Sequence, residues 1–255
     1  MAYLLEVCAD SVKSAVEAQT GGADRIELCS ALVIGGLSPS AAMFEQVKKN
    51  VDLPIRVLLR PRFGDFCYDE YEFKTLEEEV RIFREAGAAG VVIGILRPDG
   101  TLDIDRMEKL ISCAKEGSEA PPCTVTFHRA FDVCRDAKEA LEQCIQLGVD
   151  TILTSGQKNS AWNGRDLLRE LVKESEGKIE ILAGAGINPE VIKKLSDYAE
   201  VTSFHMSGKK VVDSLMKFRR EDVPMGIPGF PEFDIWQTDS EQIKQAKQIL
   251  TAMSL

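Results

Sequence analysis

The segment Gly22-Ala-Asp-Arg-Ile-Glu-Leu28 carries the pattern that decides the fold. Its glycine, Gly22, is of the kind that ends a helix, and the run that follows is typical of a short strand. Two weak echoes, at residues 87–93 and 148–154, place Gly87 and Gly148 before similar runs. The repeat predicts one helix-to-strand unit that is used several times along the chain.

Along the rest of the chain, short apolar runs alternate with longer amphipathic segments. We predict eight strands, at Tyr3–Val7, Arg25–Leu28, Ile55–Leu59, Gly90–Gly94, Cys123–Phe127, Thr151–Thr154, Ile179–Ala183 and Val201–Phe204. Helices are expected between them, for example at Leu76–Ala86, and a final helix is expected at Ser240–Met253. The Pro/Gly-rich stretch before that helix, residues 221–239, is too apolar for a flexible linker, so we expect it to be packed.

Eight such units indicate an α/β protein with a single (β/α)8 TIM barrel, and 255 residues suit one domain spanning 1–255. An open, doubly wound sheet is the alternative. That fold usually has fewer strands and a glycine-rich nucleotide loop after the first one, whereas here the first strand leads into Cys8-Ala-Asp-Ser11. The barrel is therefore favoured.

The composition restricts the class of partner. The chain is 44% hydrophobic and 28% charged, which is typical of a globular protein. A formal net charge of -10, without a long Lys/Arg cluster, disfavours nucleic acid and anionic membranes as partners. Seven scattered cysteines and the lack of a signal-like or long apolar segment indicate free thiols and a cytoplasmic location. We expect a small-molecule or protein partner.

Polar residues recur at the carboxyl ends of the predicted strands. In a barrel, these ends form the face that carries binding and catalytic groups. Glu6 and Glu27 stand in otherwise apolar strands, and Arg60, closing the third strand, is expected to pair with them. A purely structural ion-pair network is the alternative to a functional role. The chain has two histidines, and both His128 and His205 follow a predicted strand directly, which is unexpected by chance.

Charged loops follow two of these strands. Arg60, Arg62 and Asp65 lie after the third strand, where two guanidiniums suit an anionic ligand, and we expect Arg62 to stay free for it. A loop that only neutralises the mouth glutamates explains the same charges equally well. Arg129 and Asp132 follow His128 after the fifth strand and are further candidates.

The loops after the seventh and eighth strands read Gly184-Ala-Gly-Ile-Asn188 and Ser207-Gly-Lys209. In many barrels these two loops bind phosphate through backbone amides, which makes Gly184, Gly186 and Ser207 candidates. Because glycine is also common wherever a strand turns sharply, phosphate or carboxylate binding and a simple turn both remain open.

Cys8 and Cys29 each lie two positions after a mouth glutamate, on adjacent predicted strands. Neighbouring strands are about 4.8 Å apart, so the two thiols should be close enough to share a soft ion such as Cu(I). Cysteine is also a common small core residue, and the spacing alone favours that role. The other five cysteines form no C-x-x-C pair and no zinc-finger spacing.

A set of motifs in the same order resembles the CutC family of copper homeostasis proteins. The motifs are Leu5-Glu-Val-Cys8, Ala23-Asp-Arg-Ile-Glu-Leu-Cys29, Gly35-Gly-Leu-Ser-Pro39, Arg60-Pro-Arg62 with Gly64-Asp-Phe66, Phe127-His-Arg-Ala-Phe-Asp132, Leu153-Thr-Ser-Gly156 and Gly184-Ala-Gly186. They run from the first strand past the seventh, and together they are highly specific. The sequence departs from the family pattern at Phe63 and Gln157, where a glycine is usual.

The resemblance implies a cytoplasmic TIM barrel that forms a homo-oligomer, a dimer or a tetramer, and binds Cu(I) through Cys8 and Cys29. Copper homeostasis with Cu(I) as the bound ion is therefore the first functional hypothesis. This hypothesis requires no catalysed reaction and no organic cofactor. His205 or Met206 would assist the two thiols in binding the ion.

The second hypothesis is an enzyme acting on a small anionic metabolite at the mouth of the barrel. Its candidate catalytic residues are Glu6, Glu27, His128 and Asp132. Its candidate substrate-binding residues are Arg60, Arg62, Asp65, Arg129, Ser155, Gly184, Gly186, His205 and Ser207. A weaker third hypothesis is a partner-binding surface around Phe230, Phe233 and Trp236, a segment that would equally cover the barrel or form an oligomer contact.

Overall fold

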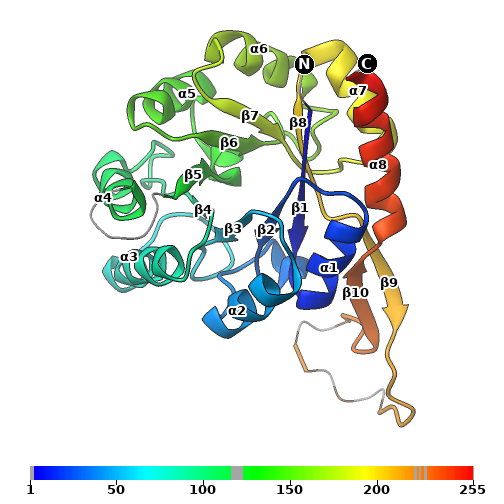
Figure 1. Cartoon of the computed structure of the whole chain (residues 1–255). Helices are drawn as coiled ribbons and strands as arrows, with labels where there is room; N and C mark the ends of the chain where they lie inside the picture. Colours follow the sequence, from blue (N-terminus) through cyan, green and yellow to red (C-terminus); the bar gives the residue numbers. More distant parts are fainter. Residues whose placement is uncertain (1–2, 116–122, 221–222, 224, 227–228, 255) are drawn as a thin grey trace.

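A computed structural model describes residues 3–115, 123–220, 223, 225–226 and 229–254 and contains a closed barrel of eight parallel strands (Figure 1). The strands are β1 (Leu4–Ala9), β2 (Arg25–Leu28), β3 (Ile55–Leu58), β4 (Gly90–Ile93), β5 (Thr124–Phe127), β6 (Thr151–Thr154), β7 (Glu180–Ala183) and β8 (Ser203–Met206). Pairing of β8 with β1 closes the ring. The predicted (β/α)8 fold is confirmed, although β1 and β8 run two residues further than predicted and so contain Cys8 and His205.

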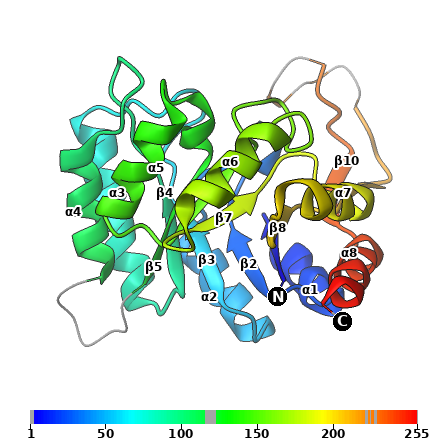
Figure 2. The same cartoon turned by 90° about the horizontal axis from the view of Figure 1, so that it is seen from above.

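Helices surround the barrel (Figure 2). They are α1 (Val12–Thr20), α2 (Ala41–Asn50), α3 (Glu70–Glu85), α4 (Ile104–Lys115), α5 (Ala137–Gln146), α6 (Arg165–Ser175), α7 (Pro189–Ala199) and α8 (Ser240–Met253), with short 3-10 turns η1 (Leu32–Ile34) and η2 (Arg129–Val133). The final helix has the predicted bounds. Helix α3 begins before the predicted Leu76 because Asp69 and Glu72 form a capping box at its start. None of the described helices is long and apolar enough to cross a membrane.

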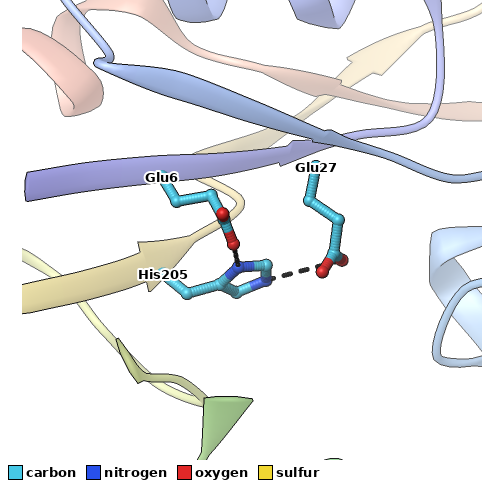
Figure 3. Close-up of side chains that lie close together, drawn as sticks. All are labelled: Glu6, Glu27 and His205. Carbon is cyan, nitrogen blue, oxygen red and sulfur yellow. Dashed lines mark hydrogen bonds and ion pairs between the residues drawn. The ribbon is translucent and has the colours of Figure 1, made fainter. Parts of the chain in front are cut away.

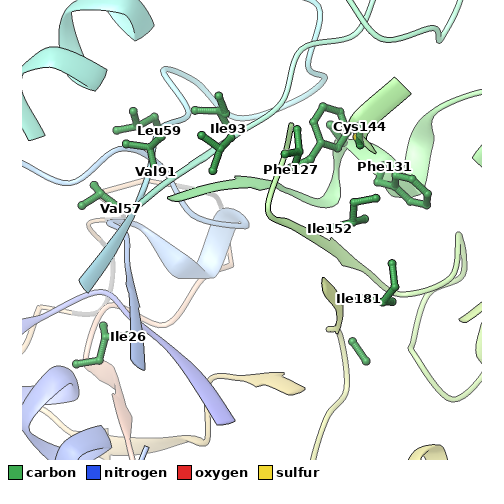
Figure 4. Close-up of a cluster of buried hydrophobic side chains, with 14 of the residues drawn as sticks. Ile26, Val57, Leu59, Val91, Ile93, Phe127, Phe131, Cys144, Ile152 and Ile181 are labelled. Carbon is green, nitrogen blue, oxygen red and sulfur yellow. The ribbon is translucent and has the colours of Figure 1, made fainter. Parts of the chain in front are cut away.

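The main hydrophobic core lies between the strands and the surrounding helices. Outward-facing Ile26, Val57, Val91, Phe127 and Ile152 belong to it, as Figure 4 shows. Successive side chains of a strand point to opposite faces, so the alternate residues fill the barrel interior. Inside the barrel, Cys29, Leu58 and Val92 form a small apolar cluster, and Leu153 and Leu182 are also buried there. Much of the remaining interior is therefore available to polar groups.

A hairpin interrupts the βα rhythm after β8. Strands β9 (Lys209–Asp213) and β10 (Asp234–Thr238) pair in antiparallel fashion and stand outside the barrel near α1 and α8 (Figure 1). We call residues 209–238 the arm. The expectation of a packed connection at 221–239 is wrong for most of the part that the structure describes, because Met225 is 76% exposed and Ile235 is 48% exposed, although Thr238 near its end is buried. Residues 221–222, 224 and 227–228 of that prediction lie outside the described residues.

Candidate functional site

A buried layer of charges fills the barrel interior beneath the mouth. Glu6 of β1 accepts a hydrogen bond from Arg25 Nε of β2 at 2.5 Å, and Arg25 also pairs with Glu180 of β7 at 3.1 Å. Arg56 of β3 donates to Thr126 and to Thr151, at 2.9 and 3.1 Å. This charge layer of Glu6, Arg25, Arg56 and Glu180 links β1, β2, β3 and β7 across the interior. Because its groups are paired and hydrogen-bonded, burial is tolerated.

The sequence-based prediction that Arg60 pairs with Glu6 and Glu27 is wrong, because Glu6 pairs with Arg25 and Arg56 and the ion pair of Glu27 is with His205. Arg25 was overlooked as the first residue of a predicted strand, where a charge is commonly exposed. Its signal was the period-two spacing, since Arg25 lies two positions before inward-facing Glu27 and therefore faces inward as well. Arg56 and Glu180 carry the same signal relative to Leu58 and Leu182.

His205 of β8 bridges the two mouth glutamates (Figure 3). Its Nδ1 lies 2.8 Å from Glu6 Oε1, and its Nε2 lies 3.9 Å from Glu27 Oε1, too far for a hydrogen bond. Glu6 and His205 are Cα partners in the β1–β8 ladder, which brings their side chains together. The predicted clustering of Glu6, Glu27 and His205 is confirmed, and their ligand atoms lie within 4.8 Å of one another.

The two glutamates have opposite pKa shifts. Burial would raise the pKa of Glu6, but the hydrogen bond with His205 and the charge of Arg25 outweigh it and lower the pKa to about 2. Burial raises the pKa of Glu27 to about 7, and the neighbouring Glu6 charge acts in the same direction. The pKa of His205 rises well above its usual value, because Cys8, Glu27 and Glu6 favour its cation despite burial. Glu27 is the carboxyl that changes protonation near neutral pH.

Above this cluster lies a cavity of about 420 Å³, which we call the mouth cavity. Most of its wall comes from strand ends and from the loops that follow them, the position expected for a barrel site. The lining residues used below are Cys8, Glu27, Arg60, Phe66, His128, Arg129, Ala185, Gly186, Ile187, His205, Met206, Ser207 and Lys209.

Arg60 lines the mouth cavity but is held by backbone oxygens rather than by carboxylates. It donates to the carbonyls of Gly36 and Gly64, at 3.2 and 2.7 Å, and its guanidinium lies 4.9 Å from the centre of the Phe66 ring. The side chain is buried, and within the described part of the chain no carboxylate pairs with it and its Nε has no acceptor. Arg60 is therefore a buried cation without a counter-charge.

The other predicted cations have partners. Arg62 pairs with Asp65 and with Glu72, at 2.8 and 2.6 Å, so the expectation that it stays free is wrong. Neither Arg62 nor Asp65 is among the lining residues of the mouth cavity. Arg129 does line it, but its Nε binds Asp132 at 2.6 Å.

His128, predicted as a proton-transfer group, lines the same cavity directly after β5. Its Nδ1 accepts a hydrogen bond from the amide of Ala130 at 3.1 Å, and its Nε2 has no partner among the described residues. Burial, and then the charge of Arg60, lower the pKa of His128 to about 3. The imidazole is therefore neutral at physiological pH.

Asp132, predicted as a catalytic candidate, orders the loop after β6 and does not line the cavity. It accepts hydrogen bonds from the hydroxyl of Thr154, from the amide and hydroxyl of Ser155 and from the amide of Gln157. Ser155 is fully buried by these contacts. Gln157, where the family usually has glycine, adopts a left-handed φ of 55°.

Part of the loop after β7 borders the cavity as predicted, with Gly186 but not Gly184 among the lining residues. Ala185 and Gly186 have left-handed φ values of 72° and 74°. The amides of Ala185, Gly186 and Ile187 have no acceptor within the described chain. Ser207 borders the cavity after β8, next to Lys209, whose ammonium lies 3.9 Å from the Trp236 ring centre.

The two predicted copper ligands differ in access. Cys8 lines the mouth cavity beside His205, whereas Cys29 is fully buried against Leu58 and donates to the carbonyl of Ala9 at 3.7 Å. Burial, and then the neighbouring Cys8, raise the pKa of the Cys29 thiol well above its usual value. Of the two thiols, that of Cys8 therefore borders the cavity, whereas that of Cys29 does not.

Known proteins resemble this chain over most of its length. The sequence model of the CutC family matches residues 3–210. The chain belongs to the CutC family. A family protein CutC from Histophilus somni is 41% identical over 96% of this chain and 98% of its own length. The human copper homeostasis protein cutC homolog is 39% identical over 97% of this chain and 89% of its own.

Solved structures give the same result for the fold. A CutC crystal structure from Streptococcus agalactiae superposes with a TM-score of 0.75 at 26% identity, covering 80% of this chain and 98% of that one. Thiamine phosphate pyrophosphorylase from Pyrococcus furiosus reaches a TM-score of 0.58 at 19% identity over 98% of this chain and 96% of its own. The second likeness concerns the barrel alone, because unrelated functions share this fold.

Proposed function

We propose that this CutC protein is an enzyme that performs acid–base chemistry on a small anionic substrate in the mouth cavity. One observation carries the proposal. Glu27 Oε2, Arg60 Nε and His128 Nε2 are buried polar atoms without a hydrogen-bond partner among the described residues, and all three residues line this cavity. Unsatisfied buried polar groups are costly to stability, so their convergence on one cavity favours a ligand that satisfies them.

Glu27 is the proposed general acid or base. A group transfers protons most effectively when its pKa lies near the working pH, and the pKa of Glu27 is raised to about 7 by burial and by Glu6. Glu6, in contrast, is ionised and hydrogen-bonded to His205, which gives it a positioning role.

Arg60 is the proposed anion-binding group. Of the three Arg and Lys side chains that line the cavity, Arg129 pairs with Asp132 and Lys209 lies over Trp236, whereas Arg60 has no counter-charge in the described chain. An anionic substrate group would neutralise it. The amides of Ala185 and Gly186 add donors from the opposite side of the barrel.

The test is calorimetric titration with phosphate, acetate and glycolate. Arg60→Lys keeps a positive charge but removes the fork of donors, and we expect it to weaken anion binding about 10-fold or more. Arg62→Lys is the matched control, since Arg62 lies outside the cavity lining and should be replaceable without effect. Equal affinities in wild type and Arg60→Lys, or no binding of any of the three anions, would contradict the proposal.

Cu(I) binding is the second candidate, favoured by the soft donors Cys8 and Met206 beside His205 in the same cavity and by the copper homeostasis names of relatives. Copper in this case is the cargo rather than a cofactor. Participation of Cys29 requires its thiol to leave the carbonyl of Ala9. Competition with a Cu(I) chelator tests the candidate. Cys8→Ser and Cys29→Ser should each abolish tight binding if the ion is shared, and unchanged affinity in either variant excludes the shared site.

We also propose a cytoplasmic location and self-association, both expected from the sequence and from the family resemblance. Exposed apolar side chains on the arm support self-association, with Leu215 92% and Phe218 69% exposed. Fractionation of the source cells and sedimentation of the purified chain test the two proposals separately.

A further inference from the structure

The hydrogen-bonding pattern of His128 fixes which ring nitrogen carries its proton. Nδ1 accepts the amide proton of Ala130, so in the neutral ring the hydrogen lies on Nε2. His128 is 4% exposed, and its Nε2 has no acceptor in the described part of the chain. The mouth cavity is therefore lined by a neutral imidazole with one unused N–H donor.

One aromatic side chain packs both against the ring that carries this donor and against a positive charge. The Phe66 ring lies 4.8 Å from the His128 ring and 4.9 Å from the Arg60 guanidinium, centre to centre, so one aromatic side chain packs against both groups. Carbonyls of Gly36 and Gly64 fix Arg60 from the other side. The arrangement is preorganised, since both groups are positioned before any ligand arrives.

The strand next to His128 leaves room for the imidazole. A Cβ atom at Gly94, directly after β4, would lie 2.6 Å from both Nδ1 and Cε1 of His128. Real Cβ atoms do not approach other atoms so closely. The absence of a side chain at Gly94 is thus a condition for the observed ring position.

We propose that the Nε2–H of His128, beside the Arg60 guanidinium, binds the carbonyl oxygen of the substrate, and that Glu27 removes a proton from the adjacent carbon. The substrate class is a small ketone or aldehyde that carries an anionic group, and the reaction class is enolisation. This inference rests on the proposed function and specifies its reaction. Glu27 supplies the buried acceptor, because it lines the cavity and its Oε2 has no partner among the described residues.

The step balances without a further reactant. Glu27 carboxylate takes the proton, the C–H electron pair becomes the new C=C bond, and the carbonyl π pair moves onto oxygen. The resulting enolate oxygen accepts the hydrogen bond from His128 and lies next to the Arg60 charge. A neutral imidazole suits this role, since in triosephosphate isomerase a glutamate base works with a neutral histidine that polarises the carbonyl. Return of the proton to carbon regenerates Glu27.

The chain contains two histidines, which makes the test direct. In protein labelled with 15N-histidine, His205→Gln assigns the signals, and we expect a neutral His128 ring protonated on Nε2 from pH 6 to 8. Pyruvate and oxalate, a planar enolate mimic, should shift the Nε2–H signal downfield. In D2O, the methyl protons of bound pyruvate should exchange for deuterium, at least about 100-fold more slowly in His128→Phe. His128→Gln, which keeps an N–H donor, should recover part of the rate.

Three results would overturn the inference. The first is a ring protonated on Nδ1 or on both nitrogens. The second is binding of pyruvate or oxalate without a shift of the Nε2–H signal, or with no deuterium exchange in bound pyruvate. The first and second results both leave anion binding by Arg60 intact, so the broader proposal survives them. The third is no binding of either compound or of phosphate, which removes the proposed function together with this inference.

Discussion

At the scale of single residues, Glu6 and Glu27 show how environment divides the roles of two like side chains. Both are buried on adjacent strands and both face His205. Glu6 has Arg25 and His205 as hydrogen-bonded partners, whereas one oxygen of Glu27 has none among the described residues. The ionised form is therefore stabilised in the first case and destabilised in the second.

We predict that Glu27→Gln stabilises the protein at pH 8 but not at pH 4.5. The pKa of Glu27 rises from 4.5 to about 7 on folding, so the folded state holds a proton that the unfolded state has lost, and stability falls as the pH rises through that window. Removing the group should recover about 1–3 kcal/mol at pH 8. Urea unfolding of both proteins at the two pH values measures the difference, and an equal difference at both would contradict the prediction.

Glu6→Gln should have the opposite effect. It leaves Arg25 and Arg56 with Glu180 as their one remaining carboxylate partner in the charge layer, and we expect a loss of roughly 3–5 kcal/mol at pH 7. The pKa of Glu6 is lowered from 4.5 to about 2, so its contribution is present above pH 4.5 and is lost as the pH falls through 2. The same urea experiment compares the two glutamine variants, and a mild or stabilising effect of Glu6→Gln would show that the charge layer is dispensable.

Sequence reasoning could find Glu6 and Glu27 because an isolated carboxylate in an apolar strand is unusual. It could not assign their partners, since the reach and direction of an arginine depend on the packed interior. Arg60 follows the strand and turns to backbone carbonyls, while Arg25 and Arg56 lie deeper and face the carboxylates. Telling which arginines face the carboxylates requires the register of neighbouring strands.

At the scale of secondary-structure elements, β4 shapes the barrel interior by omitting side chains. A Cβ at Gly90 would lie 2.3 Å from Thr124 Oγ1 and 3.1 Å from Arg56 Cγ. Gly94, at the other end of the strand, makes the corresponding room for His128. The position of Arg56 in the charge layer and the position of the His128 ring at the mouth both depend on these two inward-facing glycines.

We predict that Gly94→Ala destabilises the protein by about 1–3 kcal/mol and displaces the His128 ring, because the added methyl group overlaps it. Gly226→Ala is the matched control, since a Cβ there meets no atom of the described residues within 4 Å. Urea unfolding gives the stability and the 15N signals of His128 give the ring position. An unchanged ring signal in Gly94→Ala would mean that the space is less restrictive than the contacts indicate.

The sequence predicted the existence of the eight barrel strands because each is a short apolar run before or after a helical segment. Their ends were harder to predict: His205 and Cys8, polar or small residues, continue strands whose apolar signal has already stopped. The β9–β10 hairpin was missed because its residues are largely exposed and have no clear inward face. Tertiary pairing rather than local pattern defines these elements.

At the scale of the whole molecule, exposed apolar side chains are unevenly distributed. Among the described residues, eight of the fourteen exposed large hydrophobic side chains lie on the arm, between Val211 and Ile235. A concentration of exposed apolar side chains in one segment favours an interaction surface there. The barrel itself exposes such residues singly.

We predict that the chain self-associates and that the double variant Leu215→Ser with Phe218→Ser raises the dissociation constant at least about 10-fold through lost apolar burial. Tyr71→Ser is the matched control, because Tyr71 is 82% exposed on α3, away from the arm. Sedimentation velocity across a concentration series measures the effect. A wild-type protein that stays monomeric, or equal effects of the two changes, would rule out the arm as the contact.

The central claim is that the barrel mouth contains a carboxyl group ready to exchange a proton near neutral pH. Carbon-13 NMR titration of the glutamate side chains, with the Glu27 signal assigned by its loss in Glu27→Gln, measures this directly and requires no knowledge of the substrate. The account predicts a midpoint near pH 7 for Glu27. A midpoint near the ordinary value of 4.5 would contradict it.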